Sequence, residues 1–495
     1  MANGDSAMET YNLHQTTKDF LQQAAIPLFV DGKWVSSTQS IPVEDPATSD
    51  TIATTCLGSA EDIDYAVKAA KNAFIPWSSL SPEVRSAKLN KLAELMDRDA
   101  QILGELETLD VGKPLEAALG FDVPFGADCF RYFAELAKSA SYDVDLNLST
   151  TDSETIKRPY GVAAFVFPWN FPLTLCAWGI APALAAGNTV VVKPASETPL
   201  ATMYLAKLIE EADFPAGTVN FIPGTGVEAG EALINHPDIK LMSFTGSTVV
   251  GKRVGEVCGK NLVPAKLELG GKGAAVVCKD ADLDKAAEGL AGAISLNAGQ
   301  VCCTATRWYI HESIYDTLIT KVTERLSKVR VGAGMDAGTE MGPMCTQKQL
   351  TKVLNCIADA QAQGARVVTG GRRLSGPGYF MEPTLLAGDD DNRWAQEEIF
   401  GPVAFLLKFS DEDEVIERAN RNPYGLANSV WTEDSARARK LAKTLVAGNS
   451  WINAHNVFEY GLPYGACNQS GCGGGVNSPQ TYEGYLRSQS VASVR

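Results

Sequence analysis

The sequence has little of what metal sites and nucleic-acid binding require. It contains four histidines, and its eleven cysteines form no C-x-x-C pair, so a zinc site has no support. Acidic residues outnumber basic ones by 59 to 43, and a net charge of −16 repels the phosphates of nucleic acids and of anionic lipids. We therefore expect no metal, no nucleic-acid partner and no membrane partner.

From its first twenty residues we expect no leader segment. These residues are polar and acidic, with neither an apolar signal core nor an Arg-rich transit pattern, and an odd number of cysteines favours reduced thiols; together these predict a cytoplasmic protein. One uncharged run, between Arg158 and Lys193, has the length of a membrane span. Because Pro168, Asn170 and Pro172 interrupt it, the run instead predicts a buried strand–loop–helix–strand.

Helical patterns alternate with short apolar runs over most of the 495 residues. Residues 60–74, 82–109 and 198–211 carry apolar side chains at helical spacing. The apolar runs of a first series are VAAFVF (162–167), NTVVV (188–192), TVNFI (218–222), KLMSF (240–244) and AAVVC (274–278). Those of a second series are RWYIH (307–311), ARVVTG (365–370), VAFLLKF (403–409) and SVWT (429–432).

Continuous apolar strands separated by helices are typical of parallel sheets covered on both faces. The fold class predicted is therefore α/β, with two doubly wound units joined near the LELGGKG turn at 267–273. Two flanking segments, about 140–158 and 478–495, alternate polar and apolar residues and are candidates for an antiparallel ribbon.

A candidate nucleophile lies in the run NAGQVCCT, residues 297–304. Cys302 follows a Gly-Gln-x turn that comes after an apolar helical stretch, where a substrate can approach. The alternative is an inert buried thiol, as for most cysteines. Since the thiolate is the reactive form, the site must lower an ordinary pKa of about 8.5.

Two further residues suit acid–base and electrostatic roles. Glu268 lies between Leu267 and Leu269 and precedes a glycine turn, so desolvation would raise its pKa and suit it to work as a general base. Asn170, in FPWNFP, has an amide that can donate to a developing oxyanion. The alternatives are a solvated charge at a strand end and an ordinary turn residue.

Glycine-containing turns after two predicted strands are candidates for phosphate binding. Gly246 and Ser247 follow a strand and open a helix, whose first N–H groups can hold a phosphate. Gly226 and Gly230 fit a glycine loop only loosely, and neither segment has the G-x-G-x-x-G pattern. Lys193 comes directly after a strand, where the ribose of a dinucleotide would lie.

Taken together, these motifs resemble those of the aldehyde dehydrogenase superfamily. PWNFP, VVKPASETP, FTGST, LELGGKG, GQVCC and EEIFGP (397–402) occur in the family's order and at its spacings, from about residue 28 to the C-terminus. The resemblance implies a homodimer or homotetramer in which each chain has three parts. These are a dinucleotide-binding domain (1–139 and 159–267), a catalytic domain (268–477) and a β-ribbon oligomerisation arm (140–158 and 478–495).

The resemblance also implies a reaction, the NAD(P)⁺-dependent oxidation of a small aldehyde to an acid. Cys302 would attack the aldehyde, Asn170 and the Cys302 backbone N–H would form the oxyanion hole, and Glu268 would activate the hydrolytic water. Cys303 would be a passive neighbour, or a disulfide partner of Cys302 under oxidation. Three alternatives stay open: a CoA-acylating relative, a semialdehyde dehydrogenase, and an inactive structural or binding protein on the same scaffold.

For the cofactor, the resemblance implies NAD or NADP. Many NAD-preferring members have Glu three residues after the lysine, whereas this chain has Ser196 there and Glu197 next. Losing a carboxylate relieves repulsion of a 2′-phosphate, which favours tolerance of NADP. The implied cofactor-binding residues are Phe167, Trp169, Lys193, Ser196, Glu197, Gly226, Gly230, Gly246, Ser247, Glu398 and Phe400.

The substrate is the least determined part. Three aromatics, Phe171, Trp178 and Tyr464, resemble the box of betaine aldehyde and aminoaldehyde dehydrogenases, but aromatic rings also line ordinary apolar aldehyde pockets. KPASETP resembles semialdehyde dehydrogenases, although no arginine in the predicted pocket loops would bind a carboxylate. The segment 468–475, which ends in the glycine-rich run 471–475, lacks the Lys and the Arg of the family's K-x-S-G-x-G-R pattern. The implied pocket is Phe171, Trp178, Leu296, Val301, Asn456, Phe458 and Tyr464.

Overall fold

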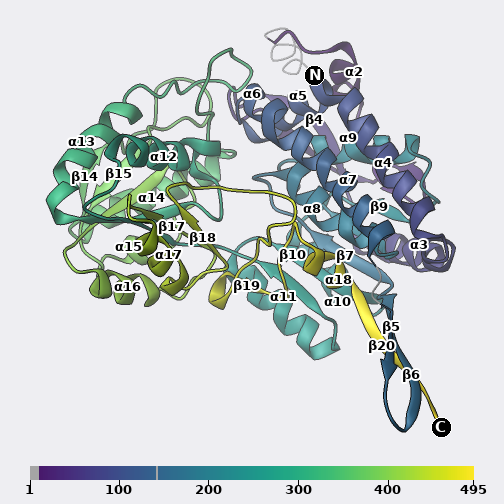
Figure 1. Ribbon diagram of the computed structural model, residues 1–495. Helices are drawn as coiled ribbons and strands as arrows, with labels where there is room; N and C mark the ends of the chain where they lie inside the picture. The colour runs from purple at the N-terminus through teal and green to yellow at the C-terminus, as the bar shows by residue number, and fades with distance from the viewer. Residues whose placement is uncertain (1–10, 141–142) are drawn as a thin grey trace.

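Two α/β units lie side by side in the computed structural model, and a narrow β-ribbon extends from one of them (Figure 1). The structure describes residues 11–140 and 143–495. Segment 1–10, which belongs to the polar N-terminus discussed above, and positions 141–142 of the predicted ribbon lie outside the described residues. In the described part of the chain, no helix is both long and apolar enough to cross a membrane.

The first unit is built on an eight-stranded sheet. Its middle strands are parallel, whereas both edges are antiparallel. The strands in spatial order are β19 (Gly471–Cys472), β11 (Ala265–Glu268), β10 (Ile239–Thr245), β7 (Val162–Val166), β8 (Thr189–Lys193), β9 (Val219–Phe221), β1 (Leu28–Val30) and β2 (Lys33–Val35). Its helices are α3 (Ala60–Ser78), α4 (Pro82–Arg98), α5 (Ala100–Val111), α7 (Val123–Ser139), α8 (Pro172–Ala185), α9 (Leu200–Glu211), α10 (Glu231–Asn235) and α11 (Thr248–Asn261).

The second unit is built on a seven-stranded sheet that is parallel except for β14 at one edge. Its strands in spatial order are β14 (Arg366–Thr369), β15 (Thr384–Ala387), β16 (Val403–Phe409), β13 (Ala305–His311), β12 (Gly273–Val277), β17 (Ala427–Trp431) and β18 (Asn449–Ile452). Its main helices are α12 (Leu283–Ser295), α13 (Tyr315–Leu326), α14 (Gln347–Ala362), α16 (Glu412–Asn420) and α17 (Ser435–Thr444).

Strand β7 shows why these runs are apolar at every position. Ala163 and Phe165 belong to the core on one face of the sheet, together with α8 and α9. Val162 and Ala164 belong to a separate core on the other face, together with α3 and α11. Since successive side chains of a strand point to opposite faces, a sheet covered on both faces needs apolar residues throughout.

The two α/β units and the strand–loop–helix–strand over 158–193 are confirmed, because this run forms β7, α8 and β8. Three details differ from expectation. The predicted helix 82–109 is two helices divided at Asp99. The run AAVVC, grouped with the first series, forms β12 in the second sheet. The short strand β19 belongs to the first sheet, although the range predicted for the catalytic domain includes it.

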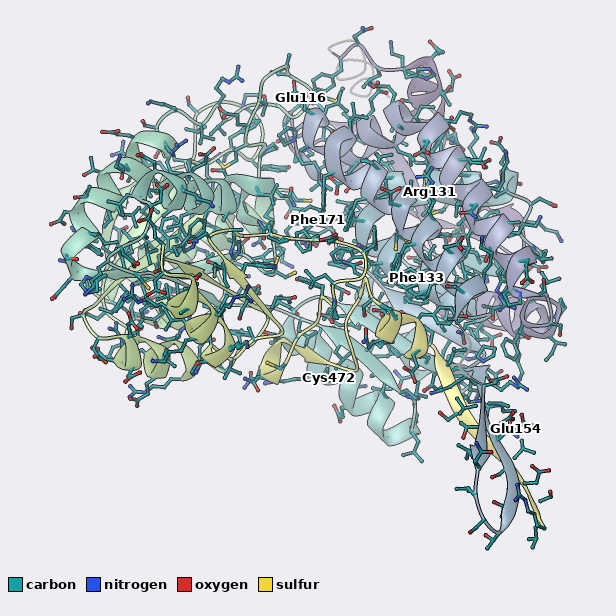
Figure 2. The ribbon with its side chains drawn as sticks, viewed as in Figure 1. Glu116, Arg131, Phe133, Glu154, Phe171 and Cys472 are labelled. Carbon is teal, nitrogen blue, oxygen red and sulfur yellow. The ribbon has the colours of Figure 1, made fainter. Side chains whose placement is uncertain are left out.

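The flanking segments pair as predicted. Strand β20 (Leu486–Val494) pairs antiparallel with β6 (Thr151–Pro159), which also pairs with β5 (Val144–Asn147). Glu154, in the middle of β6, lies far out on this ribbon, away from both α/β units (Figure 2). Most residues of β20 are exposed, as expected for a projection that packs on no core of its own chain.

Candidate active site

The turn that carries Cys302 into the cleft between the units is held in an unusual backbone conformation. After α12, Asn297, Ala298 and Gly299 have positive φ values of 49°, 52° and 68°. A left-handed conformation costs roughly 1–3 kcal/mol at a non-glycine residue, so the surrounding contacts must hold this turn in place. The fully buried Gln300 does so: Nε2 donates to the Asn297 carbonyl, and Oε1 accepts the Cys345 N–H at 2.9 Å.

The electrostatics of Cys302 differ from those of the other buried thiols. A hydrogen bond from Cys303 lowers the pKa of Cys302, and the Tyr464 hydroxyl, 3.6 Å from Sγ, acts in the same direction against the effect of burial. Burial is the main reason that the pKa of thiols such as Cys176 and Cys258 is raised. Because the thiolate is the nucleophile, Cys302 is the thiol best prepared to react.

Glu268 ends strand β11 and lines the same cleft as Cys302. Burial raises the pKa of its carboxyl well above the ordinary value, the nearby Cys302 raises it further, and Lys266 lowers it. Its Oε2 is buried and accepts no hydrogen bond from any described residue. A desolvated carboxylate with a free oxygen beside a thiol can accept a proton from a small molecule held there.

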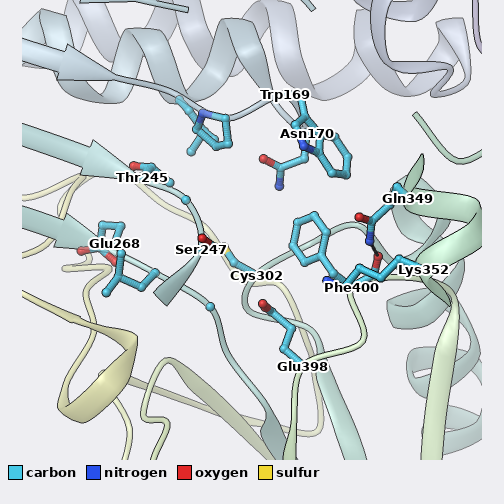
Figure 3. A pocket seen from close by; sticks show the side chains of 15 residues that line it. Trp169, Asn170, Thr245, Ser247, Glu268, Cys302, Gln349, Lys352, Glu398 and Phe400 are labelled. Atoms are coloured by element: carbon cyan, nitrogen blue, oxygen red, sulfur yellow. Dashed lines mark hydrogen bonds between the residues drawn. The ribbon is translucent and has the colours of Figure 1, made fainter. Parts of the chain in front are cut away.

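Asn170 approaches Cys302 from the loop between β7 and α8. Figure 3 shows its amide pointing toward Cys302, with Phe400 on another side of the thiol. Asn170 Nδ2 donates to the Gln300 carbonyl at 3.0 Å, and the Asn170 carbonyl accepts from Asn297 Nδ2 at 2.8 Å. Since an amide nitrogen carries two hydrogens, one donor of Asn170 is left for a ligand.

An open cleft of about 650 Å³ brings many of the predicted residues together. In it, the rings of Trp169 and Phe400 meet edge to face at 5.4 Å, and Glu398 Oε1 accepts the Gly271 N–H at 2.9 Å. Ser247 caps α11 by accepting the Val250 N–H. The predicted residues lining this cleft are Trp169, Asn170, Gly246, Ser247, Glu268, Cys302, Glu398 and Phe400.

Sequence reasoning missed three further polar residues of the cleft, Thr245, Gln349 and Lys352. Gln349 and Lys352 are three residues apart on α14, and they lie next to Phe400 in Figure 3, where Gln349 Nε2 donates to the Phe400 carbonyl at 2.7 Å. Polar residues at this spacing are typical of any solvated helix face, so the sequence holds no signal for them. Thr245 could have been found, because it lies inside the FTGST motif.

The remaining predicted cofactor residues lie away from Cys302. Lys193 is buried at the end of β8, where Nζ donates to the Pro194 and Gly224 carbonyls, and burial lowers its pKa to about 8. A side chain at Gly230 would lie 3.9 Å from the Lys193 stem. Ser196 donates to Glu197 Oε2 at 3.2 Å, both on the surface, and Gly226 is exposed. Phe167 lines a different cavity.

That second cavity, more enclosed and about 530 Å³, meets the cleft at Cys302 and Glu268. Trp178 and Tyr464 line it, and Phe458 packs against both rings at 5.8 and 5.4 Å. Phe171 does not join this group, since its ring faces the Lys113 ammonium at 4.1 Å. The box of Phe171, Trp178 and Tyr464 is thus not assembled as expected.

Three other predicted pocket residues surround the Cys302 turn. Leu296 begins the turn and is 36% exposed, whereas Val301 is buried next to Cys302. Asn456 Oδ1 accepts the Cys303 thiol at 3.4 Å. Asn456 therefore contacts the neighbour of the nucleophile rather than the space in front of it.

Comparisons with known proteins agree with this geometry. The family model described as "Aldehyde dehydrogenase family" matches residues 34–491. Cytosolic aldehyde dehydrogenase 1 of Rattus norvegicus is 40% identical over 472 residues, 94% of each chain. The NAD⁺ complex of aldehyde dehydrogenase from Bacillus cereus has a TM-score of 0.96 at 39% identity, covering 98% of this chain and 99% of that one. Betaine aldehyde dehydrogenase from Staphylococcus aureus, in complex with NAD⁺, has a TM-score of 0.93 at 35% identity, covering 97% of both chains. A half-buried thiol, a half-buried carboxylate and a buried amide thus surround one cleft. The chain matches this family along almost its whole length, and the protein belongs to the aldehyde dehydrogenase family.

Proposed function

We propose that this enzyme oxidises an aldehyde to the carboxylic acid with NAD⁺ or NADP⁺, through a covalent adduct on Cys302 that is hydrolysed with Glu268 as base. One observation carries the proposal. Cys302, Glu268 and Asn170, which are far apart in the sequence, line one cleft with different chemistry: a thiol of lowered pKa, a carboxyl of raised pKa and a free amide donor.

In the first half of the reaction, the Cys302 thiolate adds to the aldehyde carbon and forms a C–S bond. The developing oxyanion accepts hydrogen bonds from Asn170 Nδ2 and from the Cys302 backbone N–H. A nicotinamide cofactor held beside Cys302 by Trp169 and Phe400 would supply the hydride acceptor, so that the adduct on Cys302 becomes a thioester. In the second half, Glu268 takes a proton from water, the hydroxide adds to the acyl carbon, and the C–S bond breaks with its electron pair returning to sulfur.

The residues of the cleft fit a dinucleotide. Ser247 and Gly246 lie at the exposed N-terminus of α11, a fourteen-residue helix that can hold a pyrophosphate. The Glu398 carboxylate can accept ribose hydroxyls, while Trp169 and Phe400 can hold a nicotinamide ring near Cys302. Lys193, Ser196 and Glu197 would contact the adenosine ribose, and Ser196 in place of a carboxylate makes NADP⁺ a second cofactor beside NAD⁺. Because Gly226 and Gly230 have no side chains, they would leave space for the adenosine ribose.

For the substrate we propose aldehydes with an apolar or aromatic body. Trp178, Phe458 and Tyr464 are in mutual ring contact, and Phe125 and Phe121 extend this wall at 5.9 and 6.0 Å from Trp178 and Phe458. A continuous wall of rings favours flat apolar groups.

Betaine aldehyde or an aminoaldehyde is the second candidate. The same rings offer cation–π contacts, and a structural relative is a betaine aldehyde dehydrogenase. Against it, Phe171 already faces the Lys113 ammonium rather than the rings.

Three other functions are less well supported. A CoA-acylating enzyme would not need Glu268 as a water-activating base. A semialdehyde dehydrogenase would need a group for a second carboxylate, and neither cavity at Cys302 has an arginine among its lining residues. An inactive scaffold would not need a thiol of lowered pKa beside a buried carboxyl.

We also propose that the ribbon is an oligomerisation arm and that the chain forms a homodimer or homotetramer. Strand β20 uses one edge to pair with β6, and its exposed residues lie at the edge of the three-stranded sheet. An edge strand of nine residues is a template for pairing with another chain. In this scheme 1–139 with 159–267 bind the dinucleotide and 268–477 carry the catalytic thiol. Light scattering of the intact protein and of a variant lacking 486–495 tests the assembly.

An aldehyde panel with both cofactors tests the function. Benzaldehyde, hexanal, betaine aldehyde, 4-aminobutanal and succinic semialdehyde are compared by kcat/KM with NAD⁺ and with NADP⁺, and the products are identified as acids. We expect benzaldehyde and hexanal to rank first, and Trp178→Ala to lower their kcat/KM about 10-fold more than that of acetaldehyde. A first rank for betaine aldehyde would select the second candidate. No NAD(P)H formation with any aldehyde would refute the function.

A further inference from the structure

The glycine-rich run 471–475 and Lys266 take no part in either half of the reaction proposed above. Lys266 lies two residues before Glu268 on strand β11, so both side chains point to the same face of the sheet. Their partners in β10, Ser243 and Thr245, point to that face as well. All four residues line the enclosed cavity that meets Cys302, so an ammonium and the proposed base occupy one enclosed space.

The glycines of the run allow the chain to pass close to β11. Gly471 and Gly473 have φ values of 147° and 90°, and side chains there would lie 2.0 and 2.1 Å from the Leu267 and Ala265 carbonyls. A side chain at Gly474 would lie 3.6 Å from Lys266 Nζ. The run is therefore folded over the strand that carries Lys266, and side chains at Gly471, Gly473 or Gly474 would crowd that strand or its ammonium.

Lys266 is held between the cavity and this exposed loop. Its side chain is 7% exposed, and Nζ donates to the carbonyl of the exposed residue Gly473 at 3.2 Å. On the other side, the ammonium lies 4.9 Å from the centre of the Tyr485 ring. Among the described residues no carboxylate forms an ion pair with Lys266, and the interaction with Glu268 is the one that favours its charged form.

We propose that Lys266 is the proton relay of Glu268: it receives the proton that Glu268 has taken from water and releases it at the glycine-rich loop. Lys266 acts through Glu268 and does not touch the aldehyde, so it is a positioning residue. The proposal rests on the role of Glu268 put forward above and adds the path by which that base is regenerated.

The proton balance requires such a path. Hydrolysis of the thioester moves one proton from water to the Glu268 carboxylate, and the base works again only after that proton has left. A neutral Lys266 amine accepts it and becomes an ammonium, and the ammonium then loses it to solvent beside Gly473. Burial lowers the pKa of Lys266 to about 8, so both forms of the amine are accessible near neutral pH.

The titratable groups that line this cavity are Lys266, Glu268, Cys302, Tyr464 and Tyr485. Burial raises the pKa of Tyr464 and Tyr485, so both stay neutral at physiological pH. Cys302 is occupied by the acyl group while hydrolysis takes place. Lys266 is therefore the remaining group of the cavity that can exchange a proton with Glu268 in this step.

The test compares Lys266→Met, Lys266→Gln and Lys266→Arg by stopped-flow NAD(P)H formation and by proton release to an indicator dye. We expect all three to keep the rate and amplitude of the first burst, which shows that they fold and bind the cofactor. Steady-state turnover and the later proton release should fall about 10-fold. In Lys266→Met the rising limb of kcat against pH should also move to higher pH, because Glu268 has lost a neighbouring positive charge.

Lys240→Met is the matched control, since Lys240 is an exposed lysine on the adjacent strand β10; it should behave as the unmodified enzyme. If Lys266 only anchors the loop, Lys266→Gln and Lys266→Arg, which can still donate to the Gly473 carbonyl, would restore full turnover, and the proposal would be wrong. Unchanged turnover in Lys266→Met would overturn it too. Both results differ from failure of the proposed function, which would appear as no NAD(P)H formation by the unmodified enzyme, and from failure of the proposed role of Glu268, which would appear as loss of the burst in Glu268→Gln.

Discussion

The two cavities that meet at Cys302 and Glu268 differ in openness and in polarity. Besides apolar residues such as Trp169 and Phe400, the open cleft is lined by polar side chains that include Ser247, Glu398 and Lys352. The enclosed cavity is lined by rings and by a lysine. A charged ligand of many hydroxyls and phosphates suits the first, whereas the second excludes water and leaves few places for a proton to go.

This difference indicates why the reacting groups lie where the cavities join. Cys302 needs access to a cofactor from the polar side, and Glu268 needs a desolvated position from the apolar side to act as a base. Substitutions of Cys302 and Glu268, where the two cavities meet, should change the rate of one or both half-reactions. Substitutions of residues that line only one cavity should change only the binding of the ligand in that cavity.

The largest effect is expected for Cys302→Ala, since it removes the group common to both cavities. Turnover should fall on the order of 10⁴-fold or more, because no covalent adduct forms. The Kd for NADP⁺, measured by fluorescence titration, should stay within about 2-fold, because the polar cleft remains. Cys472→Ser, a change of an exposed thiol, is the control and should keep full activity. Steady-state oxidation by Cys302→Ala at the normal rate would remove Cys302 as nucleophile.

Glu268→Gln should separate the two half-reactions. We expect the first burst of NAD(P)H to persist while steady-state turnover falls about 10²–10⁴-fold, since the amide cannot take a proton from water. The raised pKa of Glu268 means that its base form increases as pH rises through that value, so kcat of the unmodified enzyme should rise with pH. Glu268→Gln should lack this rise. Loss of the burst would show that Glu268 acts earlier, on the thiol.

Asn170→Ala tests the proposed oxyanion donor, which lies in the loop between β7 and α8. Losing one oxyanion donor should slow the burst about 10²–10³-fold without weakening cofactor binding, because the amide contacts the Gln300 turn and not the far end of the cleft. A thermal melt checks that the turn is intact. A burst of normal rate in a stable Asn170→Ala protein would mean that the backbone N–H of Cys302 suffices.

Sequence reasoning predicted more of the residues that line the open cleft than of those that line the enclosed cavity, and the reason is physical. In a parallel sheet the carboxyl ends of the strands lie at one edge, so Lys193, Thr245 and Glu268, each the last residue of its strand, are brought to the same edge by topology alone. Their motifs also have distinctive turns. Predicting the strands thus predicts the approximate place of the site.

The enclosed side depends on contacts that no local pattern records. Lys266 in a strand suggests a solvated residue. Its burial follows only when β19 pairs with β11 through a glycine-rich segment more than 200 positions later in the chain, as in the contact of Lys266 with Gly473, 207 positions apart. Phe171 is adjacent to Asn170, yet its ring faces Lys113, which lies in the loop after α5. Side-chain direction and long-range pairing are tertiary properties, and these two assignments needed the structure.

The smallest effect is expected for Ser196→Glu, at a surface position outside the residues that line the open cleft. A carboxylate there should lower kcat/KM for NADP⁺ about 10-fold through repulsion of the 2′-phosphate, and leave kcat/KM for NAD⁺ within about 2-fold. Glu197→Gln is the matched variant, because Ser196 donates to this neighbouring carboxylate. If the Glu197 carboxylate binds the ribose, Glu197→Gln should raise kcat/KM for NADP⁺, because a neutral amide does not repel the 2′-phosphate. Both variants should keep the ratio of kcat/KM for benzaldehyde to that for hexanal, since the rings of Trp178, Phe458 and Tyr464 are unchanged. An unchanged cofactor ratio in Ser196→Glu would place the selection elsewhere in the cleft, and a changed aldehyde ratio would show that the two regions are coupled rather than separate.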